Sequence, residues 1–352
     1  MRYSDTAMAP PLAQLDLFGG PPTPIVAGGR RGVAPAQAPD SLLEVAAALP
    51  RNLLLGTSSW SFPGWAGIVY EQSYSQERLA RGGLMAYAQH PLLRTVGIDR
   101  SYYAPLRRDE LKRYADAVPD DFRFLMKAHE SLTLAHYPRH ARYGARRGRP
   151  SEAFLEPGYA TLAVIDPFIE VLGDRGGPIL FQFAPQDVGA LGGPRLFAER
   201  LHRFLSALPR GPIYAVEVRN PELLCPAYRD VLADVGACHC INVYPGMPPP
   251  AVQRQRAGTD RAAALVIRWM LQPHLNYEQA KALFHPFDSL VEEDPFHREQ
   301  LSELIVEASR SAKPTFVIAN NKAEGSSPLT LARLATSVAR RLDPNGQRSS
   351  DG

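Results

Sequence analysis

The sequence predicts an α/β protein built as a single (β/α)8 barrel, for two reasons. Short apolar runs that fit buried parallel strands alternate with longer stretches that fit helices, about eight times over about 290 residues. Nearly every apolar run also ends in a charged or hydrogen-bonding side chain, which is typical of barrel strands whose carboxyl ends open into a site. An open doubly wound sheet is the alternative, but no G-x-G-x-x-G motif follows the first strand.

The strand candidates are apolar runs rich in Val, Ile, Leu and Phe. They lie at residues 53–57, 95–99, 122–127, 178–183, 213–218, 239–244, 264–269 and 315–320. The helix candidates are the longer stretches between them. They lie at residues 75–89, 108–117, 152–172, 195–207, 221–234, 296–311 and 328–341.

Two tails are expected to flank the barrel, which we place at residues 51–342. Residues 1–50 are rich in Pro, Gly and Ala, and they bury too little apolar surface to offset the entropy of ordering. We therefore predict a disordered, mobile N-terminal tail, in which residues 41–49 can form a short helix. Residues 343–352 form a polar tail of the same kind.

Composition favours an ordinary globular protein. Hydrophobic residues make up 45% and charged residues 21%, and the formal net charge of +3 is too small to mark a nucleic-acid binder. No apolar run approaches the roughly 18 residues of a membrane span. The three cysteines, Cys225, Cys238 and Cys240, cannot all pair, which favours a reducing compartment. We expect a cytoplasmic protein with no membrane contact.

The run IYAVEVRN at residues 213–220 is the most informative stretch for function. Glu217 and Arg219 are two residues apart, so they share one face of the strand. Burying charged side chains in a strand is costly unless they are paired or take part in binding or catalysis. This strand is therefore expected to open into a site. An internal ion pair that only fixes register is the alternative.

The candidate catalytic residues are Glu217, Asp99 and Lys127. Two carboxylates in unlike surroundings can have separated pKa values, so Glu217 and Asp99 are a candidate acid–base pair. Lys127, Arg219 and Arg268 can hold an anionic group or stabilise developing negative charge. Further strand-end side chains expected to bind substrate are Ser58, Trp60, Gln182, Trp269, Asn320 and Asn321.

We predict neither a metal nor a cofactor. A metal-dependent barrel needs several His, Asp or Glu ligands at its strand ends, and Asp99, His129 and Glu217 are the ones that qualify.

Five segments carry a resemblance to a known family. GTSSWSFPGW at 56–65, RFLMKAH at 123–129, ILFQFAP at 179–185, AVEVRN at 215–220 and NNKAEG at 320–325 are similar to the YecE-like family, domain of unknown function 72. The resemblance spans about residues 53–340. It implies a TIM barrel, and it implies no settled reaction.

Three positions depart from the pattern of that family. Its Glu-x-Asn in the second strand is replaced here by Gly97 and Asp99. The histidine that follows its seventh-strand arginine is absent after Arg268. The family's Asn-Asn-His of the eighth strand becomes Asn320, Asn321 and Lys322, so a lysine replaces the histidine. The resemblance therefore implies a remodelled or partly lost site.

A basic loop after the third strand is a candidate nucleic-acid contact. Residues 138–149 hold five arginines and no acid, with tyrosines nearby. Such a loop can grip phosphates and stack on bases, although a merely solvated loop is the commoner meaning of a charge run. The arginines that we expect to bind nucleic acid are Arg142, Arg146, Arg147 and Arg149.

The N-terminal segment contains QLDLF, which resembles the peptide that docks bacterial polymerases and repair proteins on the DNA sliding clamp. Gln14 would orient the peptide, and Leu15, Leu17 and Phe18 would fill an apolar pocket. The alternative is that these side chains fold back on the barrel as a staple.

We therefore expect a metal-independent enzyme that acts on a phosphate-bearing or polyhydroxylated small molecule, within DNA metabolism. One alternative is a non-catalytic, clamp-tethered DNA-binding accessory protein. Another is a carbohydrate or nucleotide enzyme unrelated to DNA.

A peptide spanning residues 13–20 is expected to bind a bacterial sliding clamp in a fluorescence-anisotropy titration. Replacing Gln14, Leu17 and Phe18 by Ala should abolish binding of the peptide and of the whole protein, because the anchors are lost. The melting temperature should not change. Loss of thermal stability without any clamp binding would support the staple instead.

Overall fold

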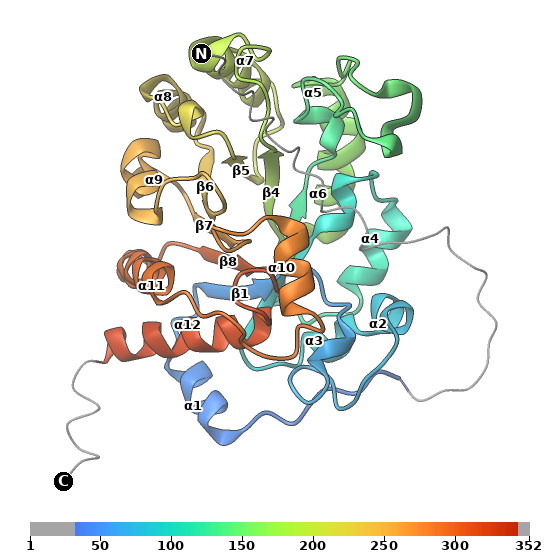
Figure 1. Ribbon diagram of the computed structural model, residues 1–352, viewed down its shortest axis with the longest axis vertical. Coiled ribbons are helices and arrows are strands. Elements are labelled where there is room, and N and C mark those ends of the chain that lie inside the picture. The colour runs from blue at the N-terminus through green and yellow to red at the C-terminus, as the bar shows by residue number, and fades with distance from the viewer. Residues whose placement is uncertain (1–31, 344–352) are drawn as a thin grey trace, which may run out of the picture.

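The computed structural model describes residues 32–343, which form one closed barrel of eight parallel strands in the order β1 to β8 (Figure 1). The strands are β1 Leu53–Thr57, β2 Leu93–Ile98, β3 Arg123–Lys127, β4 Gly176–Phe183, β5 Ile213–Val218, β6 Cys238–Val243, β7 Leu265–Trp269 and β8 Thr315–Ala319. The predicted (β/α)8 barrel is confirmed, and each predicted strand run overlaps an observed strand.

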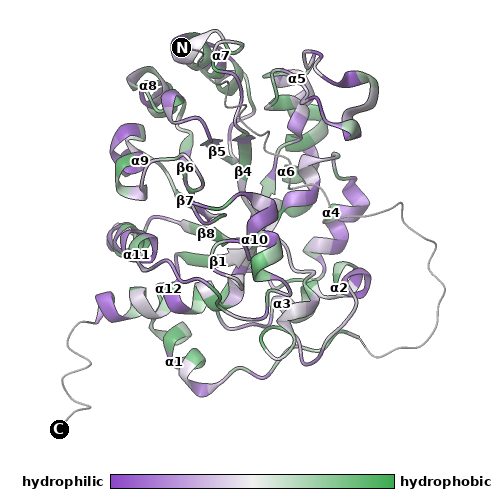
Figure 2. Cartoon of the chain, in the orientation of Figure 1, coloured by the Kyte–Doolittle hydropathy of each residue, from purple (hydrophilic) through white to green (hydrophobic). Residues whose placement is uncertain are grey.

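Most of the helices surround the barrel, whereas α10 lies in front of the strands (Figure 1). They are α1 Asp40–Ala48, α2 Gln76–Gly82, α3 Leu84–Tyr87, α4 Arg108–Ala115, α5 Pro157–Ala160, α6 Asp166–Leu172, α7 Gly193–Ser206, α8 Pro226–Val235, α9 Pro250–Ala257, α10 Tyr277–Phe284, α11 Pro295–Arg310 and α12 Ser327–Leu342. Figure 2 shows apolar colouring along the strands and mixed colouring on helices such as α10, as expected for helices with one buried face. The sequence predictions missed α9 and α10, which are short.

Side chains along each strand alternate between the barrel interior and the layer under the helices. Val266 belongs to the interior cluster with Leu125 and Leu180, whereas Ile267 belongs to the larger cluster that includes the helices. The interior positions turn from apolar to polar toward the carboxyl ends of the strands. This is the mouth of the barrel, and strand register sets its polar side chains side by side: Gln182 pairs with Glu217, and Asn242 with Arg268.

The ordered structure begins before the predicted domain boundary at residue 51. The Ala36 amide donates to the Val69 carbonyl at 3.0 Å, and α1 packs against α12. Residues 32–50 are thus part of the folded unit, because α1 covers barrel surface that would otherwise be exposed. Residues 1–31 and 344–352, for which disorder was predicted, lie outside the described residues. The clamp-binding residues Gln14, Leu15, Leu17 and Phe18 are among them.

Within residues 32–343, no helix is both long enough and apolar enough to cross a bilayer.

Candidate active site in the barrel mouth

The centre of the mouth is a carboxylate held between two guanidinium groups. Arg219 Nε donates to Glu217 Oε1 at 2.7 Å, and Arg268 Nη1 donates to Glu217 Oε2. Glu217 and Arg268 have no exposed surface, and Arg219 is 7% exposed. Strand alternation brings Glu217 and Arg219 to the interior together, as the sequence predicted.

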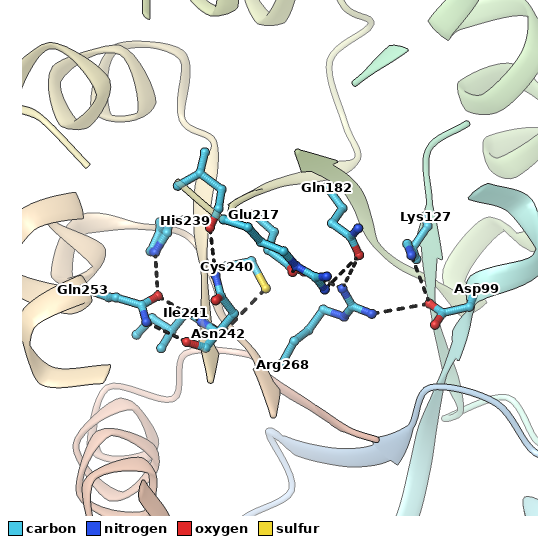
Figure 3. A network of polar contacts seen from close by, with 12 residues as sticks. Asp99, Lys127, Gln182, Glu217, His239, Cys240, Ile241, Asn242, Gln253 and Arg268 are labelled. Atoms are coloured by element: carbon cyan, nitrogen blue, oxygen red, sulfur yellow. Dashed lines mark hydrogen bonds and ion pairs between the residues drawn. The ribbon is translucent and has the colours of Figure 1, made fainter. Parts of the chain in front are cut away.

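The two arginines also contact side chains of other strands, and Figure 3 shows Arg268 between Gln182 and Asp99. Both donate to Gln182 Oε1, Arg268 Nη1 at 2.8 Å and Arg219 Nη2 at 3.2 Å. Arg268 Nη2 also lies 3.5 Å from Asp99 Oδ1. Five of the predicted site residues, in or directly after β2, β4, β5 and β7, therefore form one network.

Lys127 joins the network through Asp99 alone. Its Nζ lies 3.8 Å from Asp99 Oδ1 and 4.1 Å from the centre of the Tyr102 ring, and the side chain is fully buried. Among residues 32–343 the Nζ has no hydrogen-bond partner. Burial lowers the pKa of the Lys127 ammonium to about 7; Asp99 opposes this shift, and Arg268 and Arg219 add to it.

The surroundings of Glu217 do not favour the role of proton donor in the acid–base pair that the sequence predicts for it with Asp99. Burial alone would raise its pKa, but Arg268 and Arg219 outweigh burial and lower the pKa of Glu217 to about 2. Its carboxyl group therefore stays ionised near neutral pH and has no proton to give. Its role here is to position the two arginines, which agrees with the alternative of an internal ion pair.

Two aromatic rings cover cations at the rim of this network. The Arg219 guanidinium lies 4.0 Å from the centre of the Tyr244 ring, and Lys322 Nζ lies 4.1 Å from that of Tyr277, on α10. Lys322 is 2% exposed, and burial lowers its pKa to about 8. The sequence places Lys322 among the strand-end side chains of a polar pocket, but Lys322 was not among the predicted catalytic or substrate-binding residues.

We define the mouth cluster as Asp99, Lys127, Gln182, Glu217, Arg219, Arg268 and Lys322. Four of these side chains are cationic when protonated and two are anionic. Glu130, on the loop after β3, does not offset the excess, because Arg142 Nη2 pairs with its Oε2 at 2.5 Å. The mouth cluster is thus a buried site with a surplus of positive charge, which suits an anionic ligand.

Ser58 and Asn320 lie beside the mouth cluster at the ends of the neighbouring strands β1 and β8. Asn320 Nδ2 donates to Ser58 Oγ at 2.8 Å, and both side chains are buried. Their predicted substrate contact is compatible with this position.

The structure does not bring three of the predicted substrate-binding residues into the mouth cluster. Trp269 follows Arg268 and so points outward, into the layer under the helices. Trp60 packs edge-on against Tyr114 of α4, with ring centres 5.1 Å apart. Asn321 Oδ1 accepts hydrogen bonds from the Ser327 amide, at the start of α12, and from Trp65 Nε1.

The basic loop divides into a fixed part and an exposed part. Arg142 is held by Glu130 and Tyr143, and it stacks on Tyr103 at 5.2 Å. This residue therefore ties the loop to the rim of the mouth. Arg139, Arg146, Arg147 and Arg149 are exposed, and the Arg146 guanidinium lies 4.7 Å from the centre of the Tyr137 ring.

Carboxylate, imidazole and thiol groups do not gather in a metal-binding set of three or more anywhere in residues 32–343. The side chains next to Asp99 and Glu217 are cations, which would compete with a metal ion for both carboxylates.

The fold and the mouth cluster define a (β/α)8 barrel protein with a charged site at the strand ends. The chain matches the family described as protein of unknown function DUF72 over residues 54–350, and it belongs to that family. The resemblance to the YecE-like family is thereby confirmed.

Two solved structures of DUF72 family proteins share this fold. The one from Enterococcus faecalis is 18% identical, with a TM-score of 0.54 over 81% of this chain and 95% of that chain. The one from Thermotoga maritima is 21% identical, with a TM-score of 0.53 over 81% of this chain and 98% of that chain. At these identities the likeness shows the fold alone. A comparison with curated proteins found no match.

Glu217→Gln is expected to lower the free energy of unfolding at pH 7 by about 3–5 kcal/mol, because it removes the charge between two buried guanidiniums. The pKa of Glu217 is lowered in the folded state. Its contribution is therefore full above the ordinary value of 4.5 and is lost as pH falls toward about 2. Urea unfolding between pH 7 and pH 3 should show the difference between wild type and variant shrinking as pH falls.

Glu199→Gln, on the exposed surface of α7, is the matched control for that experiment and should cost less than about 1 kcal/mol. A wild-type-to-Glu217→Gln difference that stays constant across this pH range would contradict the assigned ionisation of Glu217.

Proposed function

We propose that the protein is a metal-independent enzyme that binds a small anionic substrate, of the phosphate-bearing or polyhydroxylated class, in the barrel mouth. The observation that carries the proposal is the surplus of cations over carboxylates in the mouth cluster. We include a cytoplasmic location, because Cys225, Cys238 and Cys240 are all free.

The surplus charge favours a ligand because unbalanced buried charge is costly. Asp99 lies near both Lys127 and Arg268, so a single negative charge faces two positively charged groups when Lys127 is protonated. A bound phosphate or carboxylate would supply the missing negative charge and accept hydrogen bonds from the guanidinium groups. Hydroxyl groups of the same substrate could bond to Ser58 or Asn320, which lie on the adjoining strands.

Lys127 is the best candidate for proton transfer in this site. A general acid or base works best when its pKa lies near the pH of the reaction, and burial brings the pKa of Lys127 to about 7. Asp99 can exchange a proton with it through a short movement or a water molecule. Glu217 supports the reaction indirectly by fixing Arg219 and Arg268.

Substrate entry requires the rim of the mouth to move, because every member of the mouth cluster is at least nine-tenths buried. The segment between β7 and α11 places Tyr277 of α10 and Phe287 over Lys322. This segment would therefore have to move for a substrate to reach Lys322.

Arg219→Gln is expected to weaken phosphate binding by at least about tenfold, or about 1.4 kcal/mol, because it removes a guanidinium while leaving a donor for Glu217. The measurement is the melting temperature of the protein against inorganic phosphate and pyrophosphate at constant ionic strength.

The control for Arg219→Gln is Arg195→Gln on α7, where the side chain is 90% exposed. It should preserve the phosphate-dependent rise in melting temperature. If the rise is absent from the wild type, or is lost equally in both variants, the anion-binding mouth is refuted.

A second candidate function is DNA binding by a clamp-tethered accessory protein. It is favoured by four exposed arginines, Arg139, Arg146, Arg147 and Arg149, on a loop that Arg142 ties to the rim of the mouth. Phosphate contacts from such a loop would hold a nucleic-acid backbone without reading its sequence. Docking of residues 14–18 on a sliding clamp remains a separate prediction.

Replacing Arg146, Arg147 and Arg149 by Ala is expected to weaken DNA binding and to reduce the slope of log affinity against log salt by up to about three, since each lost phosphate contact removes about 0.9. The measurement is a salt series of DNA titrations. The charge-matched control replaces Arg195, Arg203 and Arg210, all exposed on or just after α7. Equal effects of the two triple variants would rule out a specific role for the loop.

A further inference from the structure

We propose that Lys127 is a nucleophile that forms an imine with the carbonyl carbon of a small anionic aldehyde or ketone bound in the mouth cluster. This inference rests on the proposed function, because the cationic groups of the cluster would hold the anionic part of the same molecule.

The first argument is the incomplete bonding of Lys127. An ammonium group has three hydrogen-bond donors, and in a buried lysine with a structural role these donors normally bond to acceptors. Lys127 Nζ is fully buried, yet it has no hydrogen-bond acceptor among residues 32–343 and only the longer contact of 3.8 Å to Asp99. Its other close neighbour is the face of the Tyr102 ring. This environment tolerates a neutral amine, whose lone pair is available for attack.

The second argument is the choice of lysine at this position. The chain has 39 basic residues, of which only five are lysines: Lys112, Lys127, Lys281, Lys313 and Lys322. Arginine does not lose its proton in proteins and forms two-pronged ion pairs, so it suits a purely structural buried cation better. A chain that otherwise uses arginine nevertheless places two of its five lysines in the mouth, both buried. The chemistry that separates lysine from arginine is a primary amine that can become neutral.

The third argument is the protonation state. Burial lowers the pKa of Lys127 to about 7, so a large fraction of the amine is unprotonated at neutral pH. Arg268 and Arg219 shift the pKa in the same direction as burial. Nearby cations are one of the ways in which proteins activate a nucleophilic lysine.

Geometry limits the size of the substrate. Lys127 Nζ and Arg268 Nη2 both lie within 4 Å of the same oxygen of Asp99. A molecule whose carbonyl carbon meets Lys127 while its phosphate or carboxylate meets Arg268 or Arg219 must therefore carry the two groups only a few bonds apart. Figure 3 shows Lys127 and Arg268 both joined to Asp99, one from above and one from the left.

The step balances without an oxidant, a reductant or another reactant. The lone pair of Nζ forms the C–N bond, and the carbonyl π electrons move to oxygen, which takes up a proton. Nitrogen loses a proton to Asp99 or water, which gives a carbinolamine. The hydroxyl group then leaves as water after protonation, and the nitrogen lone pair forms the C=N bond. The protonated imine keeps a positive charge beside Asp99, so their attraction is retained.

The experiment traps the imine with sodium cyanoborohydride. The full-length protein is incubated with glycolaldehyde phosphate, with pyruvate, or with uncharged glycolaldehyde, then reduced, and its adducts are located by peptide mass spectrometry. Because the chain has five lysines, each can be followed separately. We expect an adduct of an anionic probe on Lys127 at least about tenfold above that on Lys112, Lys281 or Lys313, and much less with glycolaldehyde.

Two variants keep the result interpretable. Lys127→Arg retains the charge, and Lys127→Met removes it, and both should lose the adduct at this position. The wild type should show the phosphate-dependent rise in melting temperature, and cooperative thermal unfolding of Lys127→Arg shows that this variant is folded. Adducts spread equally over the five lysines, or concentrated on Lys322, would overturn the proposal. A wild type that binds phosphate but gives no Lys127 adduct would overturn it while leaving the proposed function intact, whereas loss of phosphate binding itself would refute both.

Discussion

The mouth of this barrel depends on one buried ion pair, in which Glu217 is held by Arg219 and Arg268. Two guanidinium groups would be very costly to bury at the end of a strand without a carboxylate between them. Glu217 fixes their planes and turns them toward Gln182 and Asp99. The contact of Asp99 with Arg268 follows from this arrangement, and the two arginines that Glu217 holds add to the effect of burial in lowering the pKa of Lys127.

Much of the site could be predicted from the sequence because a strand alternates with a period of two. In the fifth strand this rule assigned Glu217 and Arg219 to one face, and both lie in the interior. The same rule separates Arg268, which enters the mouth, from Trp269, which packs under the helices. We expected Trp269 to contact substrate only because it stands at a strand end, and strand ends alone do not specify a face.

Other features depend on contacts that a single sequence does not reveal. Tyr244 and Tyr277 come from different loops, and their positions over Arg219 and Lys322 are set by tertiary packing. Glu217 contacts Arg219 and Arg268, and these two contacts keep its carboxyl group ionised. They depend on the packing of β5 near β7, which the sequence does not show. The basic loop was recognisable by composition, but the use of Arg142 as an internal anchor was not. Membership of the DUF72 family supports the barrel fold but does not specify a reaction. The reaction must therefore be argued from the residues of the mouth cluster.

The central claim is that the surplus of positive charge in the mouth cluster exists to bind a small anion. A crystal structure of the protein grown with inorganic phosphate tests this most directly. We expect phosphate within hydrogen-bonding distance of Arg219 and of at least one of Lys127, Arg268 and Lys322, with the segment carrying Tyr277 adjusted around it. A structure in which phosphate binds the exposed arginines of the loop, while the mouth cluster stays closed and holds none, would contradict the claim.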